Sequence, residues 1–411
     1  MTMKRIMTVV LAVLALQAAW ADNKTLTLQQ CLDMAVENNL ELQTADKQVE
    51  RTRILQGTAW DVDKTSLSLS QDPTSGGSPD NALTLSQTIE FPTLYAARRS
   101  RLKAETRAEE SRREVVRNRL KGEVAAAYWQ LVYLTERMAI LNNQDTLLAR
   151  YVTVASKRCA AGEARRLELL SAERMHQDNL QELATIGSEQ AIARRTLMTL
   201  LCTDIAIVPA DTHLKPVSAG SFGYDYGQSA EGKYASLRLK AAEKAITEEK
   251  NGFAPSLSIG LRTQMVISGW DPYHENRARY AGGNFMGFEV GVGIPLFWGA
   301  TRAKVKAAKA ERDVLLLENR RQQQQRSAEY IAATDRFSAA QTKMEYYEKT
   351  GASKADEMAR IATTEYENGE ISYVEYVNAL QESMDLRLKR AAAINDFNQA
   401  AVTLWQFEGK L

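Results

Sequence analysis

The strongest constraint on the fold of this 411-residue chain is that its second half repeats its first. A strand-like segment that ends in proline and continues into a helix occurs as SQTIEFPTLYAARRSRLKAE and as EVGVGIPLFWGATRAKVKAAKAE, with Pro92 and Pro295 203 residues apart. A Gly-Glu break in a helical run also occurs twice, and Gly162 and Gly369 are 207 residues apart. Two landmarks at nearly one offset indicate a tandem structural duplication.

The duplication predicts the domain organisation. Each repeat contains an early helix, a β-hairpin and a long helical hairpin, over residues 22–205 (β-hairpin about 66–91, tip near 162) and 234–411 (β-hairpin about 256–297, tip near 369). Between the repeats, residues 206–233 contain two prolines and four glycines, which indicate a linker or an irregular equatorial segment.

The N-terminus has the three parts of a secretory signal. Lys4 and Arg5 precede the apolar run Ile6–Leu16, and Ala19-Trp20-Ala21 forms an A-x-A cleavage site. We therefore predict a signal peptide over residues 1–21. An uncleaved membrane anchor is disfavoured, because the apolar run is shorter than the roughly 20 residues that span a bilayer.

Charge and motif content exclude several functions. The 52 Lys and Arg residues balance 51 Asp and Glu residues, so no field favours nucleic acid as a partner. Three cysteines without paired spacing and three scattered histidines predict no metal site, and the sequence indicates no cofactor. Catalytic motifs such as G-x-S-x-G and H-E-x-x-H do not occur, so we expect no enzymatic activity.

The strand-like segments alternate between apolar and small or polar residues. Phe288, Val290 and Val292 alternate with glutamate and glycine, and leucines alternate with serines in the first repeat. A small soluble sheet packed on the helices fits this alternation. The export signal favours a membrane-facing sheet instead, as do aromatic residues near both strand ends: Phe91, Phe297 and Trp298, and Trp270, Tyr273 and Tyr280. Four strands cannot close a barrel, whereas three copies would supply twelve.

The helical segments are too long for a globular domain. From Tyr95 to Ala160 no proline occurs over 66 residues, enough for roughly 100 Å of helix. Small residues recur every seven positions, as Ala97, Ala104, Ser111, Asn118 and Ala125, beside Ala108, Val115, Gly122 and Trp129. A narrow seam of this period indicates coiled-coil packing, and a helical tube satisfies it better than a solid core.

These features together resemble the outer-membrane efflux protein family, of which TolC is the type. The resemblance includes the opening LTLQQCLDMAVENNLEL, the junctions at Pro92 and Pro295, and the two Gly-Glu turns in duplicated order. It implies a mixed, mostly α fold, in which a trimeric twelve-stranded transmembrane β-barrel continues as an α-helical coiled-coil barrel. The barrel would lie in the outer membrane of a Gram-negative bacterium, in contact with its lipid, with the helical part in the periplasm.

The resemblance also implies the function and its partners. The homotrimer would be the exit duct of a tripartite efflux or type I secretion system, passively conducting substrates from an inner-membrane pump through a periplasmic adaptor. The pump class (RND, ABC or MFS) and the substrate are not specified. A periplasmic coiled-coil adaptor is the alternative function, although adaptors carry one long hairpin rather than two. A passive porin is disfavoured because porins lack such helices.

Residue roles are carried over from the family's turn pattern. The implied positions are the periplasmic aperture (Glu375, Asn378), a tip latch (Glu168, Tyr366) and the adaptor-docking tips (Gly162, Glu163, Gly369, Glu370). Asn378 stands where the family has a second acidic residue, and Ile371 stands at the basic position of the latch. A carboxylate repeated by threefold symmetry forms a ring of like charges that attracts cations. Without the resemblance, Glu375 reads as a solvated helix residue.

Overall fold

The computed structural model describes residues 24–73, 79–220, 222–265 and 285–411. The predicted signal peptide (1–21) and the loop aromatics Trp270, Tyr273 and Tyr280 lie outside the described residues. The described chain is mostly helical with some strands, which confirms the predicted fold class at this level. None of its helices combines the length and apolar character needed to cross a membrane.

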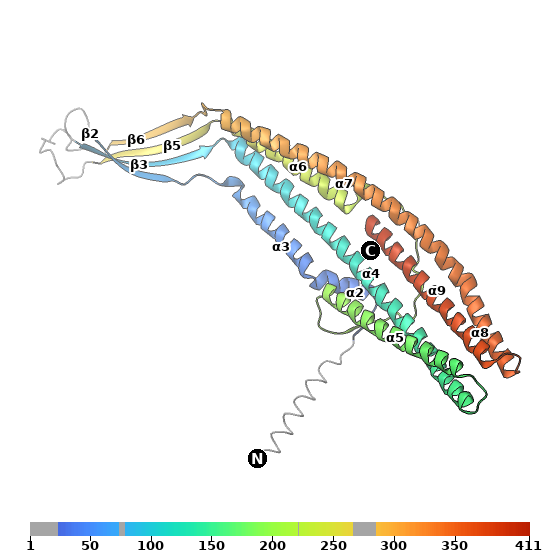
Figure 1. Ribbon diagram of the computed structural model, residues 1–411. Coiled ribbons are helices and arrows are strands. Elements are labelled where there is room, and N and C mark those ends of the chain that lie inside the picture. Colours follow the sequence, from blue (N-terminus) through green and yellow to red (C-terminus); the bar gives the residue numbers. More distant parts are fainter. Residues whose placement is uncertain (1–23, 74–78, 221, 266–284) are drawn as a thin grey trace, which may run out of the picture. The chain divides into compact units, whose positions relative to one another are not determined.

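Figure 1 shows the order of the elements along the chain. The described helices are α2 (Leu28–Asn38), α3 (Leu40–Leu55), α4 (Pro92–Ala160), α5 (Arg166–Leu200), α6 (Ala230–Asn251), α7 (Gly299–Tyr346), α8 (Ala352–Glu367) and α9 (Tyr373–Glu408). The described strands are β1 (Lys24–Leu26), β2 (Ser66–Pro73), β3 (Pro79–Glu90), β4 (Ile207–Pro209), β5 (Ser256–Met265) and β6 (Phe285–Gly293). A π-helix, Tyr347–Gly351, connects α7 to α8 without ending the helical run.

The two junctions between strand and helix differ. Pro92 is the first residue of α4, a position where the missing N–H of proline costs no hydrogen bond. In the second repeat β6 ends at Gly293 and α7 begins only at Gly299, so Pro295 lies between the two elements. Pro295 therefore lies at the junction but outside the helix, whereas Pro92 is helical. Proline restricts the residue before it to extended conformations, which keeps the helix from starting at Ile294.

By contacts, the chain divides into two compact units that each take segments from both repeats. The strand unit comprises Ala45–Arg113 and Glu231–Gln322, and the hairpin unit comprises the residues up to Thr44, Glu114–Ala230 and Gln323–Leu411. The repeats are units of sequence, whereas these two units are units of packing. The strands of both repeats pack with each other, and so do the two helix turns.

The strand unit contains a four-stranded antiparallel sheet in the order β2-β3-β5-β6. The central pairing joins the two repeats, because β3 pairs with β5 over ten residue pairs from Asn81↔Met265 to Glu90↔Ser256. The outer edges of β2 and β6 have no partner strand among the described residues. Figure 1 shows the four strands side by side.

The register sorts the side chains of this sheet onto two different faces. The row Leu67–Leu85–Leu261–Phe288 runs across all four strands on one face, and its members are 66, 43, 52 and 82% exposed. The opposite face carries Ser, Thr and Gly. At Gly291 a Cβ would lie 2.4 Å from the Ser258 hydroxyl oxygen, so a larger residue there would displace this hydroxyl. The sheet therefore has one exposed apolar face and one polar face that carries small side chains.

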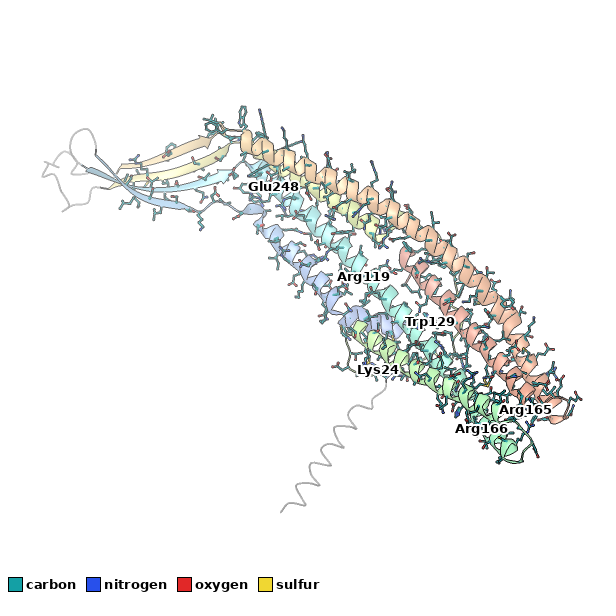
Figure 2. The ribbon with its side chains drawn as sticks, in the orientation of Figure 1. Lys24, Arg119, Trp129, Arg165, Arg166 and Glu248 are labelled. Atoms are coloured by element: carbon teal, nitrogen blue, oxygen red, sulfur yellow. The ribbon has the colours of Figure 1, made fainter. Side chains whose placement is uncertain are left out.

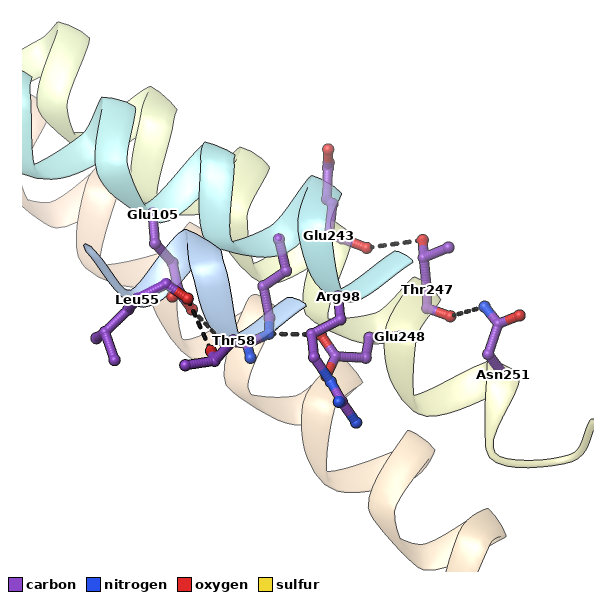
Figure 3. Close-up of polar contacts among 9 residues, drawn as sticks. Leu55, Thr58, Arg98, Glu105, Glu243, Thr247, Glu248 and Asn251 are labelled. Carbon is purple, nitrogen blue, oxygen red and sulfur yellow. Dashed lines mark hydrogen bonds and ion pairs between the residues drawn. The ribbon is translucent and has the colours of Figure 1, made fainter. Parts of the chain in front are cut away.

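Charged groups join the helices of the strand unit (Figure 3). The Arg101 Nε donates to one oxygen of Glu248 at 2.6 Å, and the Arg98 Nε donates to the other at 3.5 Å. The Glu248 side chain is only 15% exposed, so the two arginines compensate for its partial burial. This network ties α6 to the first turns of α4.

The hairpin unit has the larger hydrophobic core, built around the middle of α4. Val124, Ala125 and Leu131 on α4 are completely buried, with packing partners on α2, α5 and α9. Part of the seam of small residues that recur every seven positions on α4 faces α9. There the Asn118 side-chain amide donates to the Gln406 carbonyl at 2.7 Å. A Cβ at Gly122 would lie 2.8 Å from the Gln406 side chain, so the small residue permits this close approach.

The segment expected as a linker, 206–233, packs on this core. Its strand β4 pairs in parallel with β1, and the Tyr128 hydroxyl donates to the Asp211 carboxylate at 2.5 Å. Helix α6 begins at Ala230, so the last residues of the expected linker are helical. The early helix of the first repeat is two helices rather than one, because Asn39 ends α2 and its side-chain oxygen accepts from the first N–H groups of α3.

Candidate functional site

The first helix turn joins α4 to α5. The Glu163 N–H donates to the Arg158 carbonyl at 2.9 Å, and the Gly162 N–H donates to the Cys159 carbonyl at 3.1 Å. This pair of bonds is a Schellman motif, which requires a left-handed backbone at its central residue. Gly162 supplies it with a φ of 78°, and a Cβ there would meet no atom within 4 Å. The glycine is therefore required by the backbone and not by crowding.

The second turn, between α8 and α9, repeats this geometry. The Glu370 N–H donates to the Glu365 carbonyl at 2.8 Å, and the Gly369 N–H donates to the Tyr366 carbonyl at 3.0 Å. Gly369 has a φ of 75° and equally open surroundings. The two Gly-Glu breaks are thus the same backbone device, placed once in each repeat.

The turns differ at the residue that caps the next helix. Ser372 caps α9: its Oγ accepts from the Glu375 N–H at 3.3 Å, and the Glu375 carboxylate accepts from the Ser372 N–H at 2.8 Å. This reciprocal capping box holds the pKa of Glu375 below its usual value. The equivalent residue before α5 is Arg165, whose side chain forms no capping bond. Arginine has no acceptor and cannot cap.

Glu168 is the counterpart of Glu375 in the first repeat, 207 residues earlier, and it has a different partner. The Arg158 Nη1 donates to the Glu168 Oε1 at 3.2 Å, from the last turn of α4 to the first turn of α5. The Glu168 side chain is 19% exposed. An ion pair across the turn therefore takes the place of the capping box.

Four tyrosines lie between the two turns. Tyr366 on α8 stacks on Tyr376 of α9, with ring centres 4.7 Å apart, and Tyr373 lies 5.5 Å from Tyr151 of α4. Tyr151 is 2% exposed and packs with Leu148, Ala155, Leu169, Ala172 and Val377. Burial, followed by the charge of Glu168, raises the pKa of Tyr151. This tyrosine cluster joins the first hairpin to the second.

The turns also carry opposite charge. The first contains Lys157, Arg158, Arg165 and Arg166 against Glu163 and Glu168, and Figure 2 shows Arg165 and Arg166 at the turn. The second contains Glu365, Glu367, Glu370 and Glu375, and no lysine or arginine occurs between Arg360 and Arg387. A partner that contacts both turns therefore meets one basic and one acidic surface.

The structure places the residues that the sequence singled out as follows. Glu375 and Asn378 are exposed, three residues apart at the start of α9. Glu168 and Tyr366 do not contact each other directly; Tyr151 and Tyr373 lie between them. Gly162, Glu163, Gly369 and Glu370 are exposed at the turns. Among the described residues, no group of His, Cys, Asp or Glu is arranged to hold a metal ion.

Sequence reasoning missed two of these features. The capping box was readable as the S-x-x-E pattern from Ser372 to Glu375, directly before a helix. The tyrosine cluster had no such signal, because Tyr151 lies more than 200 residues before Tyr373 and only tertiary packing brings them together.

The fold is that of a duplicated chain in which paired strands and long helical hairpins alternate. Residues 233–410 match the model of the family described as outer membrane efflux protein. No curated protein sequence matches the chain. Solved structures share the fold, among them a membrane protein from Pseudomonas aeruginosa with 18% identity and a TM-score of 0.75, covering 92% of this chain and 93% of that one.

Two further structures are outer-membrane proteins. The open state of the Neisseria gonorrhoeae MtrE channel has a TM-score of 0.72 and 18% identity, covering 93% of this chain and 88% of that one. VceC from Vibrio cholerae has a TM-score of 0.71 and 16% identity, covering 93% and 96%. At these identities the likeness shows the fold. The match to the family model covers the second repeat, residues 233–410.

Proposed function

We propose that the chain is the subunit of an outer-membrane exit duct, in which three copies close a twelve-stranded barrel. The observation that carries this proposal is the sheet of the strand unit. Its apolar face is exposed and its outer strands have no partner among the described residues, which is costly for an isolated soluble sheet. Three such sheets joined edge to edge satisfy both edges and turn the apolar faces toward lipid.

The helical hairpins would continue this barrel as a tube through the periplasm of a Gram-negative bacterium. The heptad seam of α4 supports this, because a narrow apolar stripe suits a helix that packs in a wall one helix thick. Grooves lined by small residues lie on the hairpin unit between α4 and α5, at Ala127 and Ala193, and between α7 and α9, at Ala333 and Ala400. Helices of neighbouring copies would fill such grooves.

The two helix turns would be the periplasmic tips, where an adaptor protein docks and connects the duct to an inner-membrane pump. Support comes from their exposure. Leu167 and Leu170, beside the first turn, are 74 and 47% exposed, and neighbouring exposed apolar side chains are typical of an interaction surface. The duct would conduct passively, and the pump would select the substrate.

Glu375 and Asn378 would face the narrowest part of the tube, and Glu168 and Tyr366 would hold the closed state through the tyrosine cluster. We expect Glu375→Ala to raise single-channel conductance or weaken divalent-cation block in planar bilayers, since three carboxylates leave the aperture at once. Glu357→Ala, which removes an exposed carboxylate from α8 outside the proposed aperture, is the matched control. Unchanged conductance in Glu375→Ala would remove this residue from the aperture.

Membrane fractionation tests the proposed duct itself. The full chain should appear in the outer membrane and migrate as a heat-modifiable oligomer on denaturing gels, as closed barrels do. A freely soluble periplasmic monomer would contradict the duct and favour the adaptor alternative.

A further inference from the structure

The segment between β6 and α7 exposes three consecutive large apolar side chains to solvent. Leu296 is 77% exposed, Phe297 93% and Trp298 50%, directly after the apolar face of the sheet ends at Val292. An exposed run of this size on a soluble protein marks an interaction surface. The run continues the apolar surface of the sheet past the end of its strands.

Immediately after this segment the charge is entirely positive. No aspartate or glutamate occurs between Glu289 and Glu311, whereas Arg302, Lys304, Lys306 and Lys309 all lie there. All four cations are exposed, and none forms an ion pair with another described residue. These positions are at the start of α7, where the helix dipole favours acidic side chains. The positive charge therefore does not serve the helix itself.

Trp298 and the cations lie on the same side of the start of α7. The Arg302 guanidinium lies 5.7 Å from the ring centre of Trp298, and Lys306 and Lys309 follow at helical spacing on the same side. The first repeat has exposed cations at the positions 203 residues earlier, Arg99 and Lys103. Neither of these forms an ion pair with another described residue. We name Arg99, Lys103, Arg302 and Lys306 the basic collar.

We propose that the basic collar binds the headgroups of anionic phospholipids, with Trp298 and Phe297 inserted at the level of the acyl chains. The inference rests on the proposed membrane function and adds a lipid preference to it. Charge complementarity selects the ligand: unpaired cations next to an exposed aromatic and aliphatic rim match a phosphate-bearing surface above hydrocarbon. A zwitterionic phospholipid would satisfy the apolar rim but not the collar.

Quenching of tryptophan fluorescence by brominated lipids tests this preference. The full chain is reconstituted in phosphatidylcholine vesicles that contain either brominated phosphatidylglycerol or brominated phosphatidylcholine at the same mole fraction. We expect phosphatidylglycerol to associate more strongly by at least about fivefold, because each cation of the collar near the surface contributes about that factor. The excess should fall as salt is raised, since exposed charges are screened. The Trp298→Phe variant shows whether Trp298 is the fluorophore that is quenched, because the stronger quenching by brominated phosphatidylglycerol should disappear in this variant.

Matched double variants distinguish the effect of the collar cations from the effect of losing any two positive charges on α7. Arg302→Gln with Lys306→Gln should abolish the excess quenching. Arg320→Gln with Arg321→Gln removes the same charge from exposed positions further along α7 and should leave it intact. Equal quenching of the unmodified protein by the two lipids overturns the lipid preference but not the duct. Absence of quenching by either lipid contradicts membrane insertion itself. Excess quenching that survives in the collar variant overturns the assignment to these residues.

Discussion

The two helix turns share one backbone and differ in almost every side chain. Both are Schellman motifs centred on a glycine with positive φ, and both are followed six residues later by a glutamate. In the second turn that glutamate, Glu375, closes a capping box with Ser372. In the first turn Arg165 replaces the serine, and Glu168 pairs with Arg158 instead.

The comparison teaches that the duplication retained the shape of the turn and changed its chemistry. The first turn is basic and is stabilised by an ion pair. The second turn is acidic and is stabilised by its capping box. The helix that leads into the second turn also contains the π-helix Tyr347–Gly351, whereas α4 is continuous. π-Helices are frequent at functional sites.

The largest effect should come from the tyrosine cluster. Tyr373→Ala removes the ring between Tyr151 and Tyr366, and we expect a loss of about 2–3 kcal/mol of local stability. Hydrogen exchange should rise in both hairpins, around residues 148–155 as well as 373–380. The exposed Tyr346 is the control position. A rise confined to α9 would show that the cluster does not join the hairpins.

Substitution of the turn glycines should cost somewhat less, and equally in both turns. Alanine at position 162 or 369 must adopt a left-handed conformation, which costs about 1–2 kcal/mol. Thermal unfolding of Gly162→Ala and Gly369→Ala should therefore shift by the same amount. Gly57→Ala is the control, because Gly57 has no positive φ and open surroundings. Unequal shifts would mean that the two turns are not the same device.

The caps should distinguish the turns. Ser372→Ala removes a capping box and should destabilise the start of α9 by about 1 kcal/mol, whereas Arg165→Ala should leave α5 nearly unchanged. Arg165→Ser restores the S-x-x-E pattern with Glu168 and should stabilise the start of α5 by a similar amount. Hydrogen exchange of the first turn of each helix measures the difference, and equal responses to the two alanine substitutions would contradict it.

The smallest effect should be a pH dependence limited to the second turn. Because the folded pKa of Glu375 is lowered, its contribution to stability is present above the pKa of the unfolded chain and is lost as the pH falls through the folded value. Exchange at the start of α9 should therefore rise in acid, and Ser372→Ala should move the transition to higher pH. If the pH at which exchange rises were the same in Ser372→Ala, the cap would not be the cause of the lowered pKa of Glu375.

Much of this architecture follows from local patterns in the sequence. Alternation predicts the strands at 66–73, 79–90, 256–265 and 285–293, because in a sheet with two chemically different faces the residue type changes at every second position. Gly162 and Gly369 mark the turns, because few other residues adopt positive φ. The absence of internal proline predicts both long helical runs.

Features that depend on packing could not be read in this way. The break at Asn39 arises because its side chain caps α3 and also bonds to the Leu200 carbonyl, in a helix 161 residues away. The π-helix at Tyr347–Gly351 contains no proline, and its single glycine, Gly351, does not by itself distinguish a π-helix from an α-helix. Arg158 became a site residue only through its contact with Glu168. The aperture role of Glu375 stays a prediction, because the structure of one chain shows only its capping contact.

Cross-linking of the sheet edges tests the barrel most directly. In a chain whose native cysteines are replaced, Leu69→Cys on β2 is combined in turn with Met286→Cys, Phe288→Cys or Val290→Cys on β6. The pair Leu85→Cys and Leu261→Cys is the control, because these residues face each other within one chain. We expect a β2–β6 cysteine pair to give cross-linked species of two and three chains and none larger, while the control pair remains a single chain. Single chains alone at every β2–β6 pair would contradict this expectation.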